Sequence, residues 1–453
     1  MSQPIAVIGM GCRFPGARTP DELWDLLVDR RDPVVERPPA HRFDPVPRHD
    51  PRGRPVGLAG GYLDPEHFDP DLYGLTDREA AAVDPQHRVL LATARDALAD
   101  AGLTGLEGSD TGVFMGQSTG EHWDGHVGDV DLYSIAGAAA RSMASGRINH
   151  AWDLRGPSAT VDAACSSGSL AVHLACQSLR TGECDTALAG GVSLVLGTDH
   201  TVGYSAAGML SPTGRCHFAD EGADGFVRSD GAATLVLKRL DQAVSDGDAV
   251  HAVILGSAQA GKGRTAKSVI APSVEGYLKV ITRACATAGL TPSALGYVEA
   301  HGNAAPAGDT IELQAIGTAI GTHRPTDQPC LVGSIKSTLG HPEAAGGLAG
   351  IVKTALTLRH RTLLTGPRPT TRTSAVDWQG LNITPVETHL TWPYDGPAYA
   401  GVNTYGLSGT FVHVVLGEPP VSENLSLLHH YGEFSFTNDF QATSVRAWTS
   451  PDR

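Results

Sequence analysis

Several signals that assign a protein to a cellular location or partner are missing from this 453-residue chain. No stretch is apolar over the roughly 20 residues that a membrane-spanning helix needs, and the chain starts directly in a predicted strand, without a secretory signal. Basic residues are outnumbered, 34 against 49 acidic ones, so the net charge is −15. This charge argues against nucleic acid as a partner. We therefore expect a cytoplasmic protein that binds neither membranes nor nucleic acid.

Sequence patterns for metals and nucleotides are missing as well. The seven cysteines include no C-x-x-C pair and no zinc-site spacing, which favours a reduced, cytosolic protein without a metal. The N-terminal PIAVIGMG reads as a strand and a glycine turn, but it contains neither G-x-G-x-x-G nor G-K-[ST]. We expect no bound nucleotide and no other bound cofactor.

What the chain does contain is a strand–turn–helix–strand pattern between residues 158 and 196. Residues 158–162 predict a short strand, and small residues surround Cys165 in a tight turn. A helix is predicted from about 166 to 182, because its apolar positions cover much of its circumference. Residues 185–196 predict a buried strand.

This pattern places the Cys165 thiol at the N-terminus of a buried helix. Free N–H groups and the helix dipole favour negative charge there, so we expect a lowered thiol pKa and a thiolate nucleophile. The same N–H groups can hold an oxyanion. A small apolar core residue is the alternative for any cysteine, and it is the better interpretation for Cys176 and Cys184. The small neighbours of Cys165 leave its sulfur accessible.

The stretch DAACSSGSLAVHLA, residues 162–175, resembles the nucleophile motif of β-ketoacyl-ACP synthases, especially the ketosynthase domains of type I polyketide synthases. Four further blocks agree in order and spacing, so the resemblance covers about residues 3–417. It implies an α/β protein with the thiolase fold, in which two duplicated halves form five layers, α-β-α-β-α. It also implies a homodimer.

We divide the chain into two halves and a tail on this basis. Residues 1–249 form the N-terminal half with Cys165, and residues 250–417 form the C-terminal half with the two histidines. Residues 418–453 are a polar C-terminal tail outside the resemblance. Neither the linker nor the acyltransferase of a polyketide synthase module follows, so we expect a free-standing enzyme.

Two histidines follow apolar strands in glycine-rich loops, His301 in EAHGNAAPAGD and His341 in KSTLGHPEAAGG. With Cys165 they match the Cys-His-His set of decarboxylating ketosynthases. The resemblance makes Lys336 the family's lysine, a cation that keeps the histidines neutral. A salt bridge from Lys336 to Glu312 is its structural alternative.

The resemblance also assigns supporting roles. The backbone N–H groups of Cys165 and Leu407 would form the oxyanion hole, and Leu407 stands at the family's gate position. Asp309 matches a family acid that orders the His301 loop.

The chain departs from the family pattern beside the cleft. The usual HGTGT reads HGNAA, so Asn303 and Ala305 replace two threonines that bind the phosphopantetheine arm. Phe411 replaces a polar amide in the last loop. The segment GKGRTAKS carries Lys262, Arg264 and Lys267, which face either an acidic carrier protein or solvent.

These observations predict acylation of Cys165 by an acyl thioester, then decarboxylative Claisen condensation with a malonyl-type unit. An acyl carrier protein would deliver the phosphopantetheine arm. A ketosynthase-like acyltransferase that passes the acyl group to another nucleophile without decarboxylation is the first alternative, motivated by Asn303, Ala305 and Phe411. A non-catalytic partner subunit is less favoured because Cys165 is intact, and a thiolase would show a different C-terminal pattern.

Overall fold

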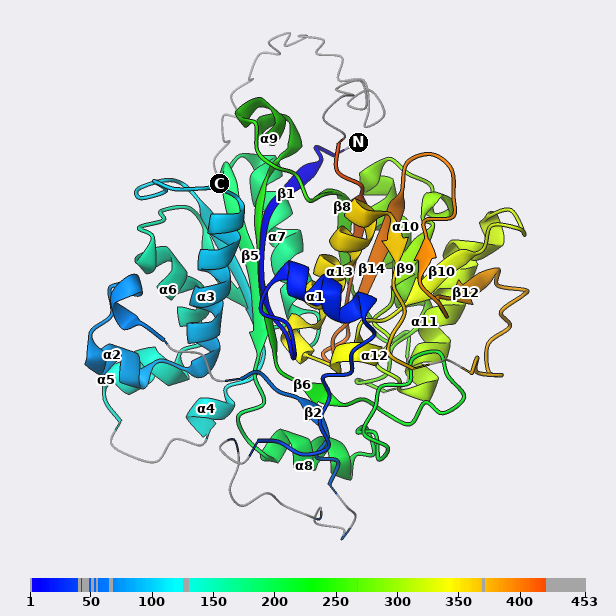
Figure 1. The fold of residues 1–453 in the computed structure, drawn as a ribbon, viewed down its shortest axis with the longest axis horizontal. Coiled ribbons are helices and arrows are strands. Elements are labelled where there is room, and N and C mark those ends of the chain that lie inside the picture. The colour runs from blue at the N-terminus through cyan, green and yellow to red at the C-terminus, as the bar shows by residue number, and fades with distance from the viewer. Residues whose placement is uncertain are drawn as a thin grey trace, which may run out of the picture. The chain divides into compact units, whose positions relative to one another are not determined.

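The computed structural model describes residues 2–39, 42, 49, 53, 56–64, 68–124, 130–266, 268–368 and 371–420 (Figure 1). Residues up to Pro419 belong to one compact unit. Most of the predicted C-terminal tail, residues 421–453, lies outside the described residues, as does Lys267. The proposed division at residues 249 and 250 stays a prediction.

A mixed sheet of eleven strands forms the centre of the molecule. Its first half contains β1 (Ile5–Arg13), β7 (Gly231–Arg239), β5 (Thr186–Ser193), β3 (Gly112–Gln117) and β4 (Ser158–Val161), in that spatial order. Its second half contains β8 (Ala252–Gly261), β15 (Thr410–Gly417), β14 (Tyr399–Tyr405), β9 (Tyr297–Glu299), β10 (Cys330–Gly333) and β12 (Ile383–Pro385). Pairs such as Ile5 with Ile254 join β1 to β8.

The two halves repeat one pairing pattern, which confirms the predicted duplication. From β1 outwards, β7 and β5 pair antiparallel, and β3 and β4 follow in parallel. From β8 outwards, β15 and β14 pair antiparallel, and β9 and β10 follow in parallel. The strand β10 therefore corresponds to β4, and β9 corresponds to β3. The loops that follow these strands lie at strand ends, where ligands of α/β proteins bind.

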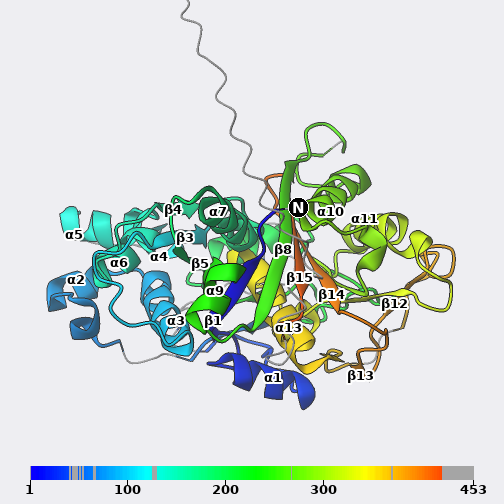
Figure 2. The same ribbon diagram turned by 90° about the horizontal axis from the view of Figure 1, so that it is seen from above.

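Helices complete five layers, as predicted. The helices α7 (Ser167–Thr181) and α13 (Gly346–His360) contact each other between the two sheet halves, and α3 (Pro85–Asp100) and α10 (Val274–Ala288) cover the outer faces (Figure 2). The helix α7 matches its predicted bounds within a residue at each end, and Gly182 ends it with a φ of 74°. That left-handed backbone favours glycine.

Shorter elements connect this framework. Thr19 caps α1 (Pro20–Val28), because its side chain accepts a hydrogen bond from the Glu22 N–H. The remaining α-helices are α2 (Asp77–Ala82), α4 (Glu121–Asp124), α5 (Leu132–Ser134), α6 (Met143–Ala151), α8 (Asp199–Ala206), α9 (Leu240–Asp246), α11 (Pro306–Ala319) and α12 (Lys336–Leu339). The remaining helical turns are η1 (Pro70–Tyr73), η2 (Ile135–Ala139), η3 (Pro292–Ala294), η4 (Gly321–His323) and η5 (Glu343–Ala345). Two small sheets pair β2 (Gly60–Gly61) with β6 (Arg228–Ser229), and β11 (Thr362–Leu363) with β13 (Leu390–Thr391).

The core lies on both sides of the sheet and between α7 and α13. The strands β1, β5 and β7 are buried almost throughout, which agrees with their continuous apolar sequences. Among the described residues, no helix combines the length and apolar character required to cross a bilayer.

Candidate active site

The turn that carries Cys165 is a strained connection between β4 and α7. Ala164 adopts a φ of 52°, a left-handed conformation that is unusual for a residue with a side chain. The Ser167 hydroxyl holds the turn, because it accepts from the Ala163 N–H at 2.9 Å and donates to the Ala164 carbonyl at 2.6 Å. Cys165 thus lies just before α7, as predicted, and keeps partial solvent exposure.

The last glycine-rich loop, between β14 and β15, packs directly on this turn. A Cβ on Gly406 would lie 2.0 Å from the Ala163 carbonyl oxygen, so only glycine permits the approach. The backbone N–H of Leu407, as well as that of Cys165 itself, hydrogen-bonds to the sulfur. Both N–H groups therefore lie beside the Cys165 sulfur. Their role as oxyanion-hole donors stays a prediction.

The predicted pKa of the Cys165 thiol was wrong in direction. Burial raises this pKa to about 12, and the negative charge of Glu343 adds to the effect. Lys336 and the two backbone N–H groups lower it but do not outweigh burial. The thiol is therefore neutral at pH 7, and its proton must leave during the reaction.

His301 follows β9 and is oriented by the Leu407 loop. The Tyr405 backbone N–H donates to Nδ1 of His301 at 3.3 Å, so Nδ1 holds the lone pair and the proton of the neutral ring sits on Nε2. The rings of His301 and His341 are nearly perpendicular, with centroids 5.4 Å apart. The structure thus brings the two predicted histidines together.

His341 has no side-chain hydrogen bond within the described part of the chain, although both ring nitrogens are buried. The Phe226 ring meets it edge-on at a centroid distance of 5.4 Å. Burial lowers the pKa of His341 well below its usual value, and the charges of Lys336 and Arg228 lower it further. Burial, Lys336 and His341 have the same effect on the pKa of His301. Both imidazoles are neutral, as predicted.

Lys336 contacts the His301 segment rather than a carboxylate. Its Nζ donates to the His301 carbonyl oxygen, and burial lowers the pKa of Lys336. The predicted alternative, a salt bridge to Glu312, is not formed. Glu312 instead accepts the N–H groups of His301 at 2.8 Å and Gly302 at 2.9 Å, and the Asn403 amide at 3.0 Å. Lys336 and Glu312 therefore both hold the His301 turn, because each forms hydrogen bonds with its backbone.

Asp309 also acts on this loop. It is buried on α11 and accepts hydrogen bonds from the backbone N–H groups of Ala219 and Ala304. Burial raises its pKa well above the usual range, and Glu312 contributes. Asp309 therefore ties the His301 loop to the segment around Ala219, consistent with its predicted ordering role.

The predicted pantetheine-channel residues fall into two groups. Asn303 and Ala305 are partly exposed, and the Asn303 side-chain oxygen accepts the Ala305 N–H at 3.2 Å. Phe411 is fully buried and packs on Tyr277 and Tyr405 at centroid distances of 4.8 and 4.7 Å. Gly276 leaves room for this ring, because a Cβ there would lie 2.3 Å from it. The role of Phe411 in the channel stays a prediction.

Lys262 also differs from the prediction. Its side chain is buried, and its Nζ donates to the carbonyl oxygens of Ser268, Val269 and Ala271 at 2.5, 2.5 and 2.9 Å. The Lys262 ammonium therefore closes the loop through these carbonyls, and it faces neither solvent nor a partner. Arg264 is exposed.

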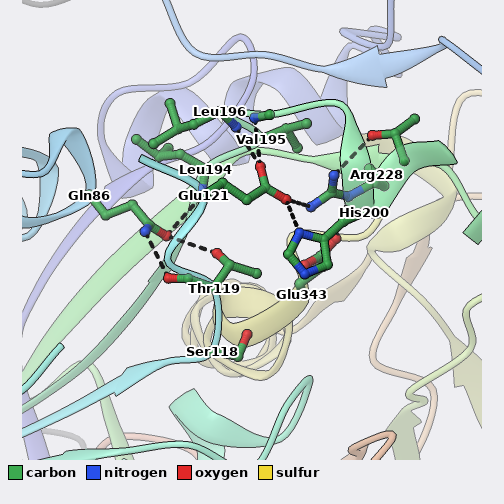
Figure 3. Close-up of polar contacts among 12 residues, drawn as sticks. Gln86, Ser118, Thr119, Glu121, Leu194, Val195, Leu196, His200, Arg228 and Glu343 are labelled. Carbon is green, nitrogen blue, oxygen red and sulfur yellow. Dashed lines mark hydrogen bonds and ion pairs between the residues drawn. The ribbon is translucent and has the colours of Figure 1, made fainter. Parts of the chain in front are cut away.

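Sequence reasoning missed a buried ionic network beside the site. Arg228 lies between Glu121 and Glu343, and His200 pairs with Glu121 from the solvent side (Figure 3). The sequence contained one indication of this network, the acidic Glu343 two residues after His341. No group of His, Cys, Asp and Glu side chains in the described ranges is arranged to hold a metal ion.

Comparisons with known proteins assign the class. Residues 2–243 match the β-ketoacyl synthase N-terminal domain, and residues 251–366 match the β-ketoacyl synthase C-terminal domain. The chain therefore belongs to the β-ketoacyl synthase family, whose members are enzymes.

The relatives are polyketide synthases. The chain is 44% identical over 434 residues to a mycocerosic acid synthase-like polyketide synthase of Mycolicibacterium smegmatis, covering 92% of this chain and 20% of that protein. It is 43% identical over 430 residues to one component of the phenolphthiocerol/phthiocerol polyketide synthase of Mycobacterium tuberculosis, covering 92% and 23%. The chain thus spans about a fifth of the length of these relatives.

Solved structures show the same fold. The ketosynthase from module 6 of the bacillaene synthase of Bacillus subtilis superposes with a TM-score of 0.81 at 34% identity, covering 92% of this chain and 72% of that one. An oxazolomycin ketosynthase domain from Streptomyces albus gives a TM-score of 0.82 at 32% identity, covering 92% and 75%. The fold is the thiolase fold, and the chain is a ketosynthase of the polyketide synthase type.

Proposed function

We propose that this chain is a condensing enzyme, in which Cys165 takes an acyl group and a carrier-bound malonyl-type unit then extends it with loss of CO₂. One observation carries the proposal. The Tyr405 N–H fixes His301 with its Nε2–H free to donate, next to the neutral His341 and the donor pair around the Cys165 sulfur.

The first step is thioester exchange at Cys165. The sulfur attacks the acyl carbonyl carbon, the N–H groups of Cys165 and Leu407 hold the oxyanion, and the bond to the donor's thiol sulfur breaks. Because burial keeps the thiol protonated, its proton leaves as the sulfur attacks. That proton then passes to the departing thiolate.

The second step forms the carbon–carbon bond. The malonyl carboxylate leaves as CO₂, and its bonding electrons generate an enolate. The Nε2–H of His301 and an N–H of His341 donate to the enolate oxygen, each contributing ~10²–10⁴-fold if it acts like other proton-donating groups. The carbanion attacks the acyl-Cys165 carbonyl, and collapse of the tetrahedral adduct releases the Cys165 sulfur.

Carrier-bound phosphopantetheine supplies both substrates in this proposal, and no bound cofactor takes part. The acidic net charge of the chain means that a docking site for an acidic carrier protein must be a local basic surface. Seven unpaired cysteines suit a reducing compartment, so we place the enzyme in the cytoplasm.

Transfer of the acyl group to another nucleophile without decarboxylation remains the second candidate. It is favoured by the HGNAA loop, where the Asn303 side chain already bonds its own loop and Ala305 offers no side-chain donor or acceptor. A non-catalytic subunit is the weaker third candidate, because the Cys165 sulfur sits among intact hydrogen-bond donors.

Intact-mass measurements with acyl thioesters and malonyl-ACP test the proposal. We expect an acyl adduct that disappears in Cys165→Ala, release of CO₂, and a longer β-ketoacyl-ACP. The matched control is Cys216→Ala, which removes another buried thiol influenced by the charge of Lys336. An adduct on Cys165 without CO₂ release would select the acyltransferase, and the absence of any adduct would revive the non-catalytic reading.

We also propose a homodimer. Within the described residues, the strand β4 is an edge of the sheet, and its outer backbone groups can pair with a second copy. Leu132 and Ile135 are 75% and 45% exposed on the segment that leads into α6, and α6 packs against β4. Sedimentation should give twice the mass of one chain, and Leu132→Glu should shift it towards the monomer. A monomeric wild-type protein would contradict this.

A further inference from the structure

His341 is held through its backbone rather than its ring. Its N–H donates to the Val227 carbonyl at 2.7 Å, and its carbonyl accepts the Ser229 N–H at 3.0 Å. Arg228, between these two residues, forms a parallel bridge with His341. The position of the imidazole therefore depends on how firmly residues 227–229 are fixed.

The Arg228 side chain fixes this segment by three directed hydrogen bonds. Its Nε donates to Glu343 at 2.6 Å, its Nη2 donates to Glu121 at 2.7 Å, and its Nη1 donates to the Thr201 hydroxyl at 2.9 Å. The guanidinium is almost fully buried. A planar fork with several donors can bridge two carboxylates in this way, whereas a lysine ammonium cannot reproduce the geometry.

Both carboxylates are anchored in turn. The second oxygen of Glu121 accepts the N–H groups of Leu196 and Gly197, at 2.7 and 2.8 Å, just after β5 (Figure 3). Burial opposes ionisation of Glu121, but hydrogen bonds from His200 and Arg228 and the charge of Arg228 hold its pKa at about 2. Glu343 lies two residues after His341 on the same turn. The network thus connects a rigid strand end to the histidine turn.

We propose that Arg228 is a positioning residue for His341, clamping its turn between Glu121 and Glu343 so that the imidazole meets the extender group. This inference rests on the proposed condensing function. Arg228 also acts on His341 through its charge, which helps to lower the pKa of His341 and so favours the neutral ring that the condensation needs.

The two chemical steps should respond differently to loss of the clamp. Cys165 is held by its own turn and by the Leu407 loop, so its acylation should persist. Decarboxylation needs His341 in register, and a displacement of about 1 Å can cost on the order of 10²-fold. A residue needed only for folding would affect both steps together.

The test compares Arg228→Lys and Glu343→Gln with the wild-type protein, each first shown to be folded by its thermal transition. Glu343→Gln is the milder change, because it keeps an acceptor oxygen for Arg228. We expect near-normal Cys165 acylation by intact mass and a roughly 10- to 100-fold loss of CO₂ release from malonyl-ACP. The matched control is His150→Gln at an exposed position outside the network, which should leave both rates unchanged.

A second readout is independent of chemistry. The ring signals of His341 in ¹³C-histidine NMR spectra, assigned with His341→Gln, should shift or broaden in Arg228→Lys and Glu343→Gln but not in His150→Gln. Unchanged signals and unchanged CO₂ release in folded variants would overturn the inference, as would parallel loss of acylation and decarboxylation. A wild-type protein that acylates but releases no CO₂ would refute the condensing function alone, and the NMR comparison would still decide the role of Arg228.

Discussion

The backbone N–H of Tyr405 donates a hydrogen bond to Nδ1 of His301 at 3.3 Å, so the last glycine-rich loop sets the tautomer of a histidine that lies 104 residues earlier. The same loop supplies the Leu407 N–H to the Cys165 sulfur two residues later. One backbone segment therefore orients the His301 ring and places an N–H group beside the Cys165 sulfur. Because these contacts come from the main chain, substitution of the Tyr405 side chain leaves them in place.

Removal of the His301 imidazole should separate the two chemical steps. In His301→Ala we expect CO₂ release from malonyl-ACP to fall ~10²–10⁴-fold, because the enolate loses an N–H donor. Acylation of Cys165 should be affected far less, because its two oxyanion donors are backbone groups. Intact mass and CO₂ release measured on the same samples separate the steps, with His150→Ala, an exposed position, as control. Equal loss in both steps would contradict this assignment.

The raised pKa of Cys165 predicts how its alkylation depends on pH. With a pKa of about 12, only about one thiol in ten thousand is ionised at pH 8, and the alkylation rate should rise about tenfold per pH unit from pH 7 to 9. Iodoacetamide labelling followed by peptide mapping measures this rate for Cys165 separately from the other cysteines. A plateau near neutral pH would show instead the lowered pKa that the helix N-terminus alone suggests.

Substitution of Lys336 should change the alkylation rate of Cys165 in a known direction. Its positive charge lowers the pKa of the Cys165 thiol, so Lys336→Met should raise that pKa further and slow alkylation at every pH in the range. The exposed Arg264 provides a control of equal charge change in Arg264→Met, and its labelling rate should match the wild type. Faster labelling in Lys336→Met would mean that the lysine acts on the thiol by restricting access instead.

The sequence was sufficient for the local parts of this site and insufficient for the distant ones. Cys165, His301 and His341 each follow an apolar strand within a turn of small residues, and the resemblance to ketosynthase motifs joined them into one site. The partners of Arg228 lie 107 and 115 residues away, so no local pattern connects them.

The wrong predictions share a physical cause. The thiol pKa depends on the balance between burial and nearby charges, and the helix N-terminus gives only one contribution to that balance. Lys262 looked like a surface charge because its carbonyl partners are created by the loop that it closes.

Lys262→Met should loosen the loop that this side chain closes. The variant keeps the alkyl length but leaves the carbonyls of Ser268, Val269 and Ala271 without their donor, at a cost of about 1–3 kcal/mol for each group that stays buried. Hydrogen–deuterium exchange should become faster across residues 262–273, and Arg264→Met should leave it unchanged. Exchange that matches the wild type would show that the ammonium contributes no net stability to the loop.

The Tyr405 hydroxyl is buried and has no hydrogen-bond partner among the described residues. An unsatisfied buried hydroxyl costs about 1–3 kcal/mol, so Tyr405→Phe should leave the melting temperature unchanged or raise it. Burial and the neighbouring Cys165 raise the pKa of this phenol to about 12, so it stays neutral at working pH. His301 keeps its backbone donor, and CO₂ release should therefore persist. A clear loss of stability would reveal a partner for the hydroxyl, whereas a raised KM for malonyl-ACP at unchanged stability would assign that partner to the substrate.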